Sequence, residues 1–352
     1  MRSMLFDAHV RAGARMAGVD GWEAPDVFTS IAAEYAAAWD AAVVYDSSPL
    51  GRLQLTGQTR TDFLDRMSTN AVKALRPGQG AATILTTPIG RIVDRVVVYV
   101  REDDAVLLSS RGAQTAVVNW MRRYIFFNDD VQVRDAPAEM GMLSVYGAKA
   151  REVASRVAGE DVSDLALHHW RAARDDLMVA CADPIAGEGF HVFARDAETL
   201  SSAWQAAIDA GAAPIGERAF EVLRIESGRP LFGRELSADY IPLEVGLWPD
   251  VSFTKGCYIG QEIIARMESR HRLARQLVGL HAKAPIEPGA DLMVNGAAVG
   301  RVSSAAVRPG GDSIGLGFVK PAFAGLGARM SIGVAGSTEV EVSQLPLPRA
   351  QF

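Results

Sequence analysis

The sequence predicts an α+β fold with mostly antiparallel sheets, followed by a separate all-β unit. Up to Arg275, helix and strand patterns are mixed without the regular strand–helix alternation that is typical of a parallel sheet. After Arg275 the helical pattern stops, and six short strand patterns punctuated by glycine and proline follow one another. The clearest boundary therefore lies near Arg275, and the segment after it is expected to be a small barrel or sandwich.

Length and composition limit the class of protein. At 352 residues the chain is too long for one small core and suits two or three compact units, with 49% hydrophobic residues to fill them. Its net charge of −6 argues against direct nucleic-acid binding, which needs a basic surface. Two cysteines cannot form a disulfide framework, so we expect a reducing compartment, the cytoplasm. No segment approaches the roughly 20 apolar residues that span a bilayer, so no membrane association is expected.

The first unit follows a leader without a clear pattern, residues 1–27, and is expected to span residues 28–140. Side chains in the run from Arg52 to Leu55 alternate in polarity, which is the period of a half-buried strand. The acidic turn 101–104 joins two apolar runs, which indicates a hairpin. The expected elements are helix 28–42, two strands within 43–55, helix 59–67, the hairpin strands 92–100 and 105–109, and helix 113–124.

The second unit shows a similar mixture and is expected to span residues 141–274. Its expected strands are 141–146, 177–181 and 190–193, and its expected helices are 148–157, 197–211 and 218–227. The all-β unit is expected to span 275–352, with strand patterns at 276–281, 291–294, 299–304, 314–319, 330–334 and 340–344.

One segment near the end of the second unit has the composition of a reactive site. Cys257 precedes a run whose apolar residues recur at helical spacing, so its thiol is expected beside a helix N-terminus, where negative charge is favoured. Lys255 adds a cation nearby, and both features make a thiol a better nucleophile or metal ligand. Spacing alone favours the simpler interpretation that Cys257 is a small buried hydrophobe beside Tyr258.

The run KGCYIGQE, from Lys255 to Glu262, resembles the signature of the YgfZ family of folate-binding proteins, within the glycine-cleavage T-protein (aminomethyltransferase) superfamily. The resemblance continues through residues 28–48, 53–70, 90–94, 223–228 and 241–244 and through the tail from Arg275. It implies a ring of three domains, with a small β-barrel at the C-terminus and tetrahydrofolate in a central cavity. The essential cysteine of the family falls on Cys257, and the accompanying motif positions are Lys255, Gly256, Tyr258, Gly260, Gln261 and Glu262.

The sequence also departs from the superfamily at positions that carry its chemistry. Where aminomethyltransferases have two consecutive aspartates, this chain has Asp94 followed by Arg95, so the catalytic acid falls on an arginine. The glutamate that holds the pterin falls on His191, and Asp94 or Glu188 could take over either role. Glu244 and Trp248, which lie close to the motif, complete the expected folate contacts.

Three functions follow from this resemblance. The leading hypothesis is a tetrahydrofolate-binding assistant in iron–sulfur cluster assembly or repair, which acts through Cys257 and so supports tRNA thiomethylation. Its expected partners are folate and iron–sulfur proteins or cluster carriers. The second is a tetrahydrofolate-dependent aminomethyltransferase or demethylase, and Arg95 argues against its glycine-cleavage form. The third is a protein-binding module that has lost both the chemistry and the folate binding. Because the histidines lack metal-site spacing and no CxxC pair exists, no resident metal is expected.

Overall fold

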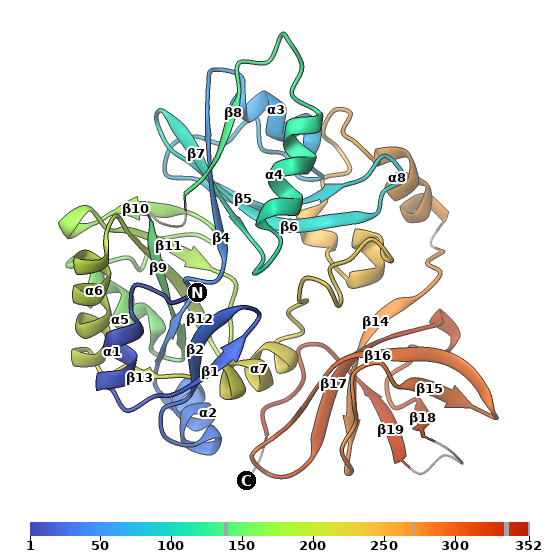
Figure 1. Ribbon diagram of the computed structural model, residues 1–352. Helices are drawn as coiled ribbons and strands as arrows, with labels where there is room; N and C mark the ends of the chain where they lie inside the picture. The colour runs from blue at the N-terminus through green and yellow to red at the C-terminus, as the bar shows by residue number, and fades with distance from the viewer. Residues whose placement is uncertain (137–139, 271, 334–337, 351–352) are drawn as a thin grey trace.

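Two large sheets, a two-stranded hairpin and a closed barrel form the β-structure of the computed structural model (Figure 1). It describes residues 1–352 except 137–139, 271, 334–337 and 351–352. The sheets stack against each other, and the barrel lies beside them at the C-terminal end. The expected α+β class, with mostly antiparallel sheets and a C-terminal barrel, is confirmed. Among the described residues, no helix is both long and apolar enough to cross a membrane.

The first sheet has five antiparallel strands and is covered on one face by two helices. Its strand order is β5 (Gly80–Thr86), β6 (Ile92–Val100), β7 (Asp104–Ser109), β4 (Gly51–Thr56) and β8 (Gln132–Asp135). Helices α3 (Arg60–Met67) and α4 (Gln114–Arg123) pack against one face, in a core that includes Val96 and Val98. The alternate residues Val97 and Tyr99 face the other sheet, because side chains alternate along a strand.

The second sheet has six strands, and both of its faces are covered. Its order is β10 (Trp170–Ala172), β11 (Met178–Ala182), β12 (Glu188–Ala194), β9 (Gly141–Gly147), β3 (Val43–Asp46) and β13 (Ala213–Pro214). All neighbours are antiparallel except the pair of β3 and β13. Helices α5 (Ala150–Ala158) and α6 (Ala197–Asp209) border one core, while α2 (Ile31–Asp40) and α7 (Glu217–Glu226) border another.

The barrel closes in the order β14 (Gln276–Ala282), β17 (Ser313–Val319), β16 (Ala297–Val307), β15 (Asp291–Val294), β18 (Arg329–Ile332) and β19 (Thr338–Ser343). All six strands expected from the sequence are present, although Val334, the end of the expected fifth strand, lies outside the described residues. Helix α7 contacts β16 and β17, so this helix connects the barrel to the second sheet.

The N-terminal part of the chain differs most from expectation. Residues of the expected leader form helix α1 (Phe6–Arg11) and a hairpin of β1 (Arg15–Val19) and β2 (Trp22–Val27). The α2 and β3 elements, expected within the first domain, pack with the second sheet, where β3 lies between β9 and β13. Such pairing joins residues about a hundred positions apart, and local sequence patterns carry no information on it.

Candidate functional site

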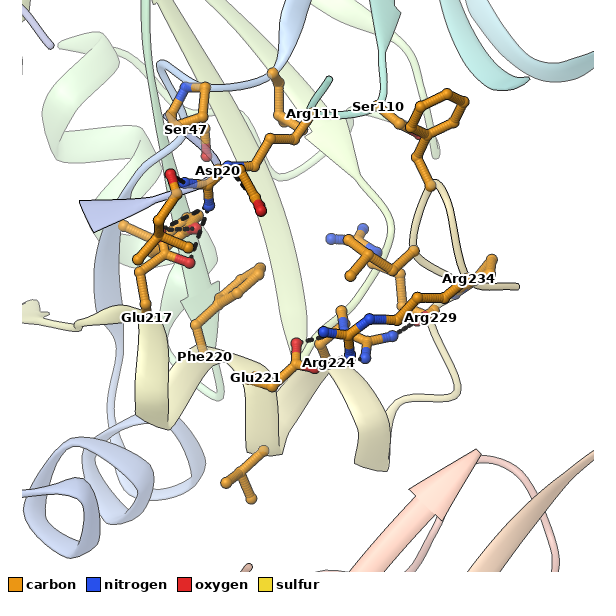
Figure 2. Close-up of a pocket in the computed structure, with 18 of the residues that line it drawn as sticks. Asp20, Ser47, Ser110, Arg111, Glu217, Phe220, Glu221, Arg224, Arg229 and Arg234 are labelled. Carbon is orange, nitrogen blue, oxygen red and sulfur yellow. Dashed lines mark hydrogen bonds and ion pairs between the residues drawn. The ribbon is translucent and has the colours of Figure 1, made fainter. Parts of the chain in front are cut away.

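A cavity of about 650 Å³ lies between the two sheets and the barrel. Helix α7 forms one wall, and Figure 2 shows its side chains Glu217, Phe220 and Glu221 along that wall. Strands β6 and β7, the turn after β11 and barrel residues 305–307 supply other parts of the lining. The site therefore draws on all three β-structures, and no single unit could form it alone.

The cavity is rich in arginine, and most of these side chains have acidic partners. Arg111 binds Glu217 at 3.0 Å, at one end of α7. Arg224 and Arg234 bind Glu221, at 2.7 and 3.1 Å, toward the other end (Figure 2). Arg218, which is exposed in the cavity lining, has no ion-pair partner among the described residues. An anionic group entering the cavity would therefore meet cationic side chains on more than one side.

Arg95 lines the cavity, and two carboxylates hold it in place. Its guanidinium donates to both oxygens of Asp183, at 2.8 and 3.1 Å, and its Nε donates to Asp250 at 2.6 Å. Burial alone would raise the pKa of Asp183, but Arg95 and Arg229 outweigh it and hold that pKa well below the usual range. Where the resemblance predicts the superfamily's acid, the structure thus has a cation fixed by a strong ionic network.

Asp94 lies on the opposite face of β6 and does not line the cavity. It is fully buried, and its Oδ2 accepts a hydrogen bond from the Ser110 backbone N–H at 2.9 Å. Its Oδ1 has no hydrogen-bond partner in the described part of the chain, and burial raises the pKa of this carboxyl to about 7. Asp94 and Arg95 thus point to different sides of β6, because strand alternation directs neighbouring side chains to opposite faces. The folate contact expected for Asp94 stays a prediction.

His191 lines the cavity, and the structure keeps its ring neutral. Its Nδ1 lies 2.8 Å from the Ser144 hydroxyl, which lies 2.5 Å from the Ser47 hydroxyl. Burial, assisted by Arg229, lowers the pKa of His191 to about 3. Where the resemblance predicts the superfamily's glutamate, the chain thus presents an uncharged hydrogen-bonding group.

The remaining expected folate contacts lie outside the cavity lining. Glu188, the first residue of β12, forms an ion pair with Arg151 of α5. Glu244 is buried, where it accepts a hydrogen bond from its own turn at the Ile241 N–H, 3.1 Å away. Trp248 is 40% exposed, with its ring 6.1 Å from that of Phe253. The structure therefore does not bring these three residues to the cavity, and their role as folate contacts stays a prediction.

Cys257 is exposed, and it does not line the cavity. It lies four residues before α8 (Gln261–Arg270), close to the expected position ahead of a helix. The cation expected to assist it is occupied, because the Lys255 ammonium donates to the backbone carbonyls of Asp65, Ser68 and Asn70 near the end of α3. Cys257 is thus neither a buried core residue nor a cavity thiol. Its role as the reactive residue stays a prediction.

The rest of the motif fastens this loop to the first sheet. Gly260 has a φ of +84°, and a Cβ at that position would lie 2.7 Å from Thr86 Oγ1 and from the Thr87 carbonyl oxygen. Thr86 also donates to the Ile259 carbonyl at 2.6 Å. Tyr258 is buried, while Gln261 and Glu262 begin α8 and are half-buried and exposed. The motif is therefore a docked structural element that holds Cys257 at the surface.

Several residues that line the cavity carry no signal in the sequence, above all Asp183, Arg229, Arg111 and Glu217. Asp183 lies in a turn between two strands, where an acidic residue is ordinary. Arg111 and Glu217 come from distant segments and meet only in the fold. No local pattern distinguishes such residues from solvated surface charges.

Comparison with known proteins identifies the family to which the chain belongs. A model described as the GCVT N-terminal domain matches residues 5–255, and one described as the glycine cleavage T-protein C-terminal barrel domain matches residues 275–348. A putative chloroplastic transferase of Arabidopsis thaliana is 32% identical over 295 residues, 83% of this chain and 68% of the relative. An aminomethyltransferase of Bacillus subtilis is 29% identical over 331 residues, 90% of each chain.

A solved structure shows the same fold over nearly the whole length. The glycine cleavage system aminomethyltransferase T of Bartonella henselae superposes with a TM-score of 0.89 at 21% identity, covering 98% of this chain and 97% of that one. The two family domains together span the sheets, the cavity and the barrel described above. The chain is therefore a member of the glycine-cleavage T-protein, or GCVT, family.

Proposed function

We propose that this protein binds tetrahydrofolate in its central cavity and serves as a folate-dependent one-carbon transferase. The observation that carries the proposal is the cavity lining, which combines apolar and aromatic surface with arginine side chains. The rings of Tyr45 and Phe220 stack with centroids 4.0 Å apart and offer a flat surface for a pteridine or aminobenzoyl ring. The exposed Arg218 and Arg234 suit the carboxylates of the glutamate tail. These residues fit the cofactor, which would supply the one-carbon acceptor.

The chemistry proposed here differs from that of glycine cleavage at one position. Arg95 cannot release or accept a proton near neutral pH, so it cannot act as the acid or base that an aspartate there would be. The name of the Bacillus subtilis relative, aminomethyltransferase, supports transfer of a carbon unit from an amine, and that of the Arabidopsis relative supports group transfer in general. We therefore expect the donor to be a small amine or methylated amine that needs no proton from position 95.

Isothermal titration calorimetry with tetrahydrofolate under anaerobic conditions tests the binding. Tryptophan fluorescence is the poorer probe, because all six tryptophans are among the described residues and none lines the cavity. We expect saturable binding that weakens in Arg218→Glu, since the tail carboxylates would then meet a like charge. Absence of binding at millimolar folate would remove the proposal. Turnover is tested by incubating the folate complex with a panel of methylated and aminomethylated donors. Failure of every donor to yield methylene- or methyl-tetrahydrofolate would contradict the transferase part alone.

A second function, in iron–sulfur cluster assembly or repair, is favoured by one specific observation. Cys257 is exposed on a loop that Lys255 and Gly260 hold in place, so its thiol is open to a molecule arriving from outside. The KGCYIGQE resemblance to the YgfZ branch supports the same function. In cells, Cys257→Ser is expected to lower the activity of iron–sulfur enzymes, including one that thiomethylates tRNA. Cys181→Ser serves as the matched control. Equal enzyme activity in both variants would contradict this role.

A further inference from the structure

The loop between α4 and β8 carries two phenylalanines that lie exposed to solvent. Phe127 is fully exposed and Phe126 is 54% exposed, whereas Tyr124 and Ile125, just before them, pack against the core of the first sheet. The loop projects from one edge of the molecule (Figure 1). Single exposed apolar residues are ordinary on a protein surface, but two adjacent aromatic side chains on a protruding loop indicate an interaction surface.

Hydrogen bonds fix this loop in its outward conformation. The Asp129 N–H donates to the Phe126 carbonyl oxygen at 3.0 Å, which closes a tight turn, and the Asp129 carboxylate accepts the Phe126 N–H at 2.9 Å. Asp130 accepts the Gln58 N–H at 2.9 Å on its carboxylate and the Thr59 N–H at 3.2 Å on its carbonyl oxygen. Because the backbone is already ordered, a partner that binds the phenylalanines pays little conformational entropy to order this loop.

Two arginines lie just before the phenylalanines in the chain. Arg122 and Arg123 are in the last turn of α4, both are exposed, and neither has an ion-pair partner in the part of the chain that the structure describes. The nearby Asp129 does not neutralise them, because its carboxylate pairs with Arg66. The loop thus presents aromatic surface beside unpaired positive charge, and both aromatic residues and arginine are enriched in protein–protein interfaces.

The loop that carries Cys257 is attached to the same end of α3 as the phenylalanine loop. The Arg66 carbonyl oxygen accepts the Ile259 N–H at 3.2 Å, two residues after Cys257. The Arg66 guanidinium pairs with Asp129, two residues after Phe127. One residue of α3 therefore holds both loops, so the exposed thiol and the exposed phenylalanines belong to one region of the surface.

We infer that Phe126, Phe127 and the Cys257 loop form one docking surface for a protein that carries an exposed thiol or cluster beside an apolar pocket rimmed by carboxylates. This inference rests on the proposed role in iron–sulfur cluster assembly or repair and deepens it. The phenylalanines would fill the pocket, while Arg122 and Arg123 would meet the carboxylates, and such charge pairing fixes register and speeds association. A bilayer fits less well, because the net charge of −6 opposes anionic lipid and a bilayer offers Cys257 no reacting group.

The test measures the activity of iron–sulfur enzymes, including tRNA thiomethylation, in cells where each variant replaces the wild-type protein at equal abundance. The double variant Phe126→Ser/Phe127→Ser should lower this activity to about the level of Cys257→Ser, because loss of two aromatic anchors weakens docking by roughly 30-fold or more. Arg123→Glu should lower it as well, since the carboxylate rim would then meet a like charge. Leu326→Ser is the matched control: Leu326 is 70% exposed near the barrel strands, and its replacement should leave the activity unchanged.

The outcomes separate this inference from the proposed function. If Cys257→Ser leaves the enzyme activity unchanged, both fall together. If Cys257→Ser lowers the activity and the double phenylalanine variant does not, the inference alone is overturned. Circular dichroism and rapid labelling of Cys257 check that the double variant is folded; should it fail to fold, Arg123→Glu decides in its place. Sedimentation with vesicles of phosphatidylcholine and phosphatidylglycerol tests the membrane alternative. Binding by wild type that is lost in the double variant would assign the surface to a bilayer and overturn the inference.

Discussion

Replacing Arg95 with methionine should destabilise the protein strongly at neutral pH and much less in acid. The change keeps most of the side-chain volume and removes the cation between Asp183 and Asp250. The side chains of the three residues are 17%, 23% and 9% exposed, so the two carboxylates would remain mostly buried without their main partner. Removing one member of a buried ion pair costs about 3–5 kcal/mol. Because Asp183 keeps Arg229 nearby and is partly exposed, we expect about 2–4 kcal/mol at pH 7.5.

The pH dependence follows from the depressed pKa of Asp183. A carboxyl group whose pKa is lower in the folded than in the unfolded state stabilises the fold above its unfolded pKa, about 4. That stabilisation is lost as the pH falls toward the folded-state pKa. Without Arg95 the Asp183 pKa rises, so the variant takes up a proton as the pH falls toward 4, and its deficit relative to wild type shrinks.

Urea unfolding followed by circular dichroism, at pH 7.5 and pH 4.5, measures both quantities as differences between variant and wild type. Arg91→Met is the matched control, since Arg91 is 39% exposed and lies 3.9 Å from Glu244. It should change stability by less than about 0.5 kcal/mol. A deficit for Arg95→Met that is below 1 kcal/mol at pH 7.5, or that is equal at the two pH values, would refute the reasoning.

Three further predictions concern the motif and the buried acid. Gly260→Ala should lower the melting temperature clearly, because Gly260 has a positive φ and a Cβ there would make close contacts. Gly256→Ala is the control and should leave the melting temperature almost unchanged, since a Cβ there would meet nothing within 4 Å. Equal shifts in the two variants would contradict the docking of the loop. Asp94→Asn should gain stability relative to wild type as the pH rises from 4 to 8, because the raised pKa of Asp94 makes its ionisation unfavourable for the folded state. A difference in the free energy of urea unfolding that does not change with pH would argue against this prediction. A chromogenic disulfide reagent should label Cys257 rapidly in the native protein. It should label Cys181 only on unfolding, because that thiol is partly buried and burial raises its pKa. The rapid phase should be missing in Cys257→Ser, and its persistence there would show that Cys257 is not the accessible thiol.

Local patterns in the sequence predicted the elements well and their assembly less well. The helix expected at 59–67 is α3, and the six strands of the barrel follow the glycine and proline punctuation. Strand β3 shows what such patterns cannot tell, because its partners β9 and β13 lie far along the chain. The turn Asp20–Gly21 closes the β1–β2 hairpin, and both of its φ angles are positive. This turn pair alone does not predict the hairpin, because the residues on either side lack a clear strand pattern.

The candidate site shows the same division between local and distant information. Arg95 and His191 were expected in the cavity from family resemblance, and both line it. Asp183 could not be expected, because its significance comes from Arg95 and Arg229, which are 88 and 46 residues away in the chain. Ionic networks of this kind form between segments that only tertiary structure brings together.

The separation of Cys257 from the cavity limits what its thiol can do. A thiolate that attacked a carbon carried by folate would have to reach the cavity, yet the motif holds Cys257 at the surface through Lys255 and Gly260. Releasing the loop would leave the Lys255 ammonium, whose side chain is 4% exposed, without three carbonyl acceptors. The thiol and the folate site are therefore expected to act on different molecules. Cys257→Ser should leave tetrahydrofolate affinity within about twofold of wild type, whereas Asp183→Asn should leave rapid thiol labelling intact. Loss of folate binding in Cys257→Ser would instead mean that the two sites are coupled through the loop.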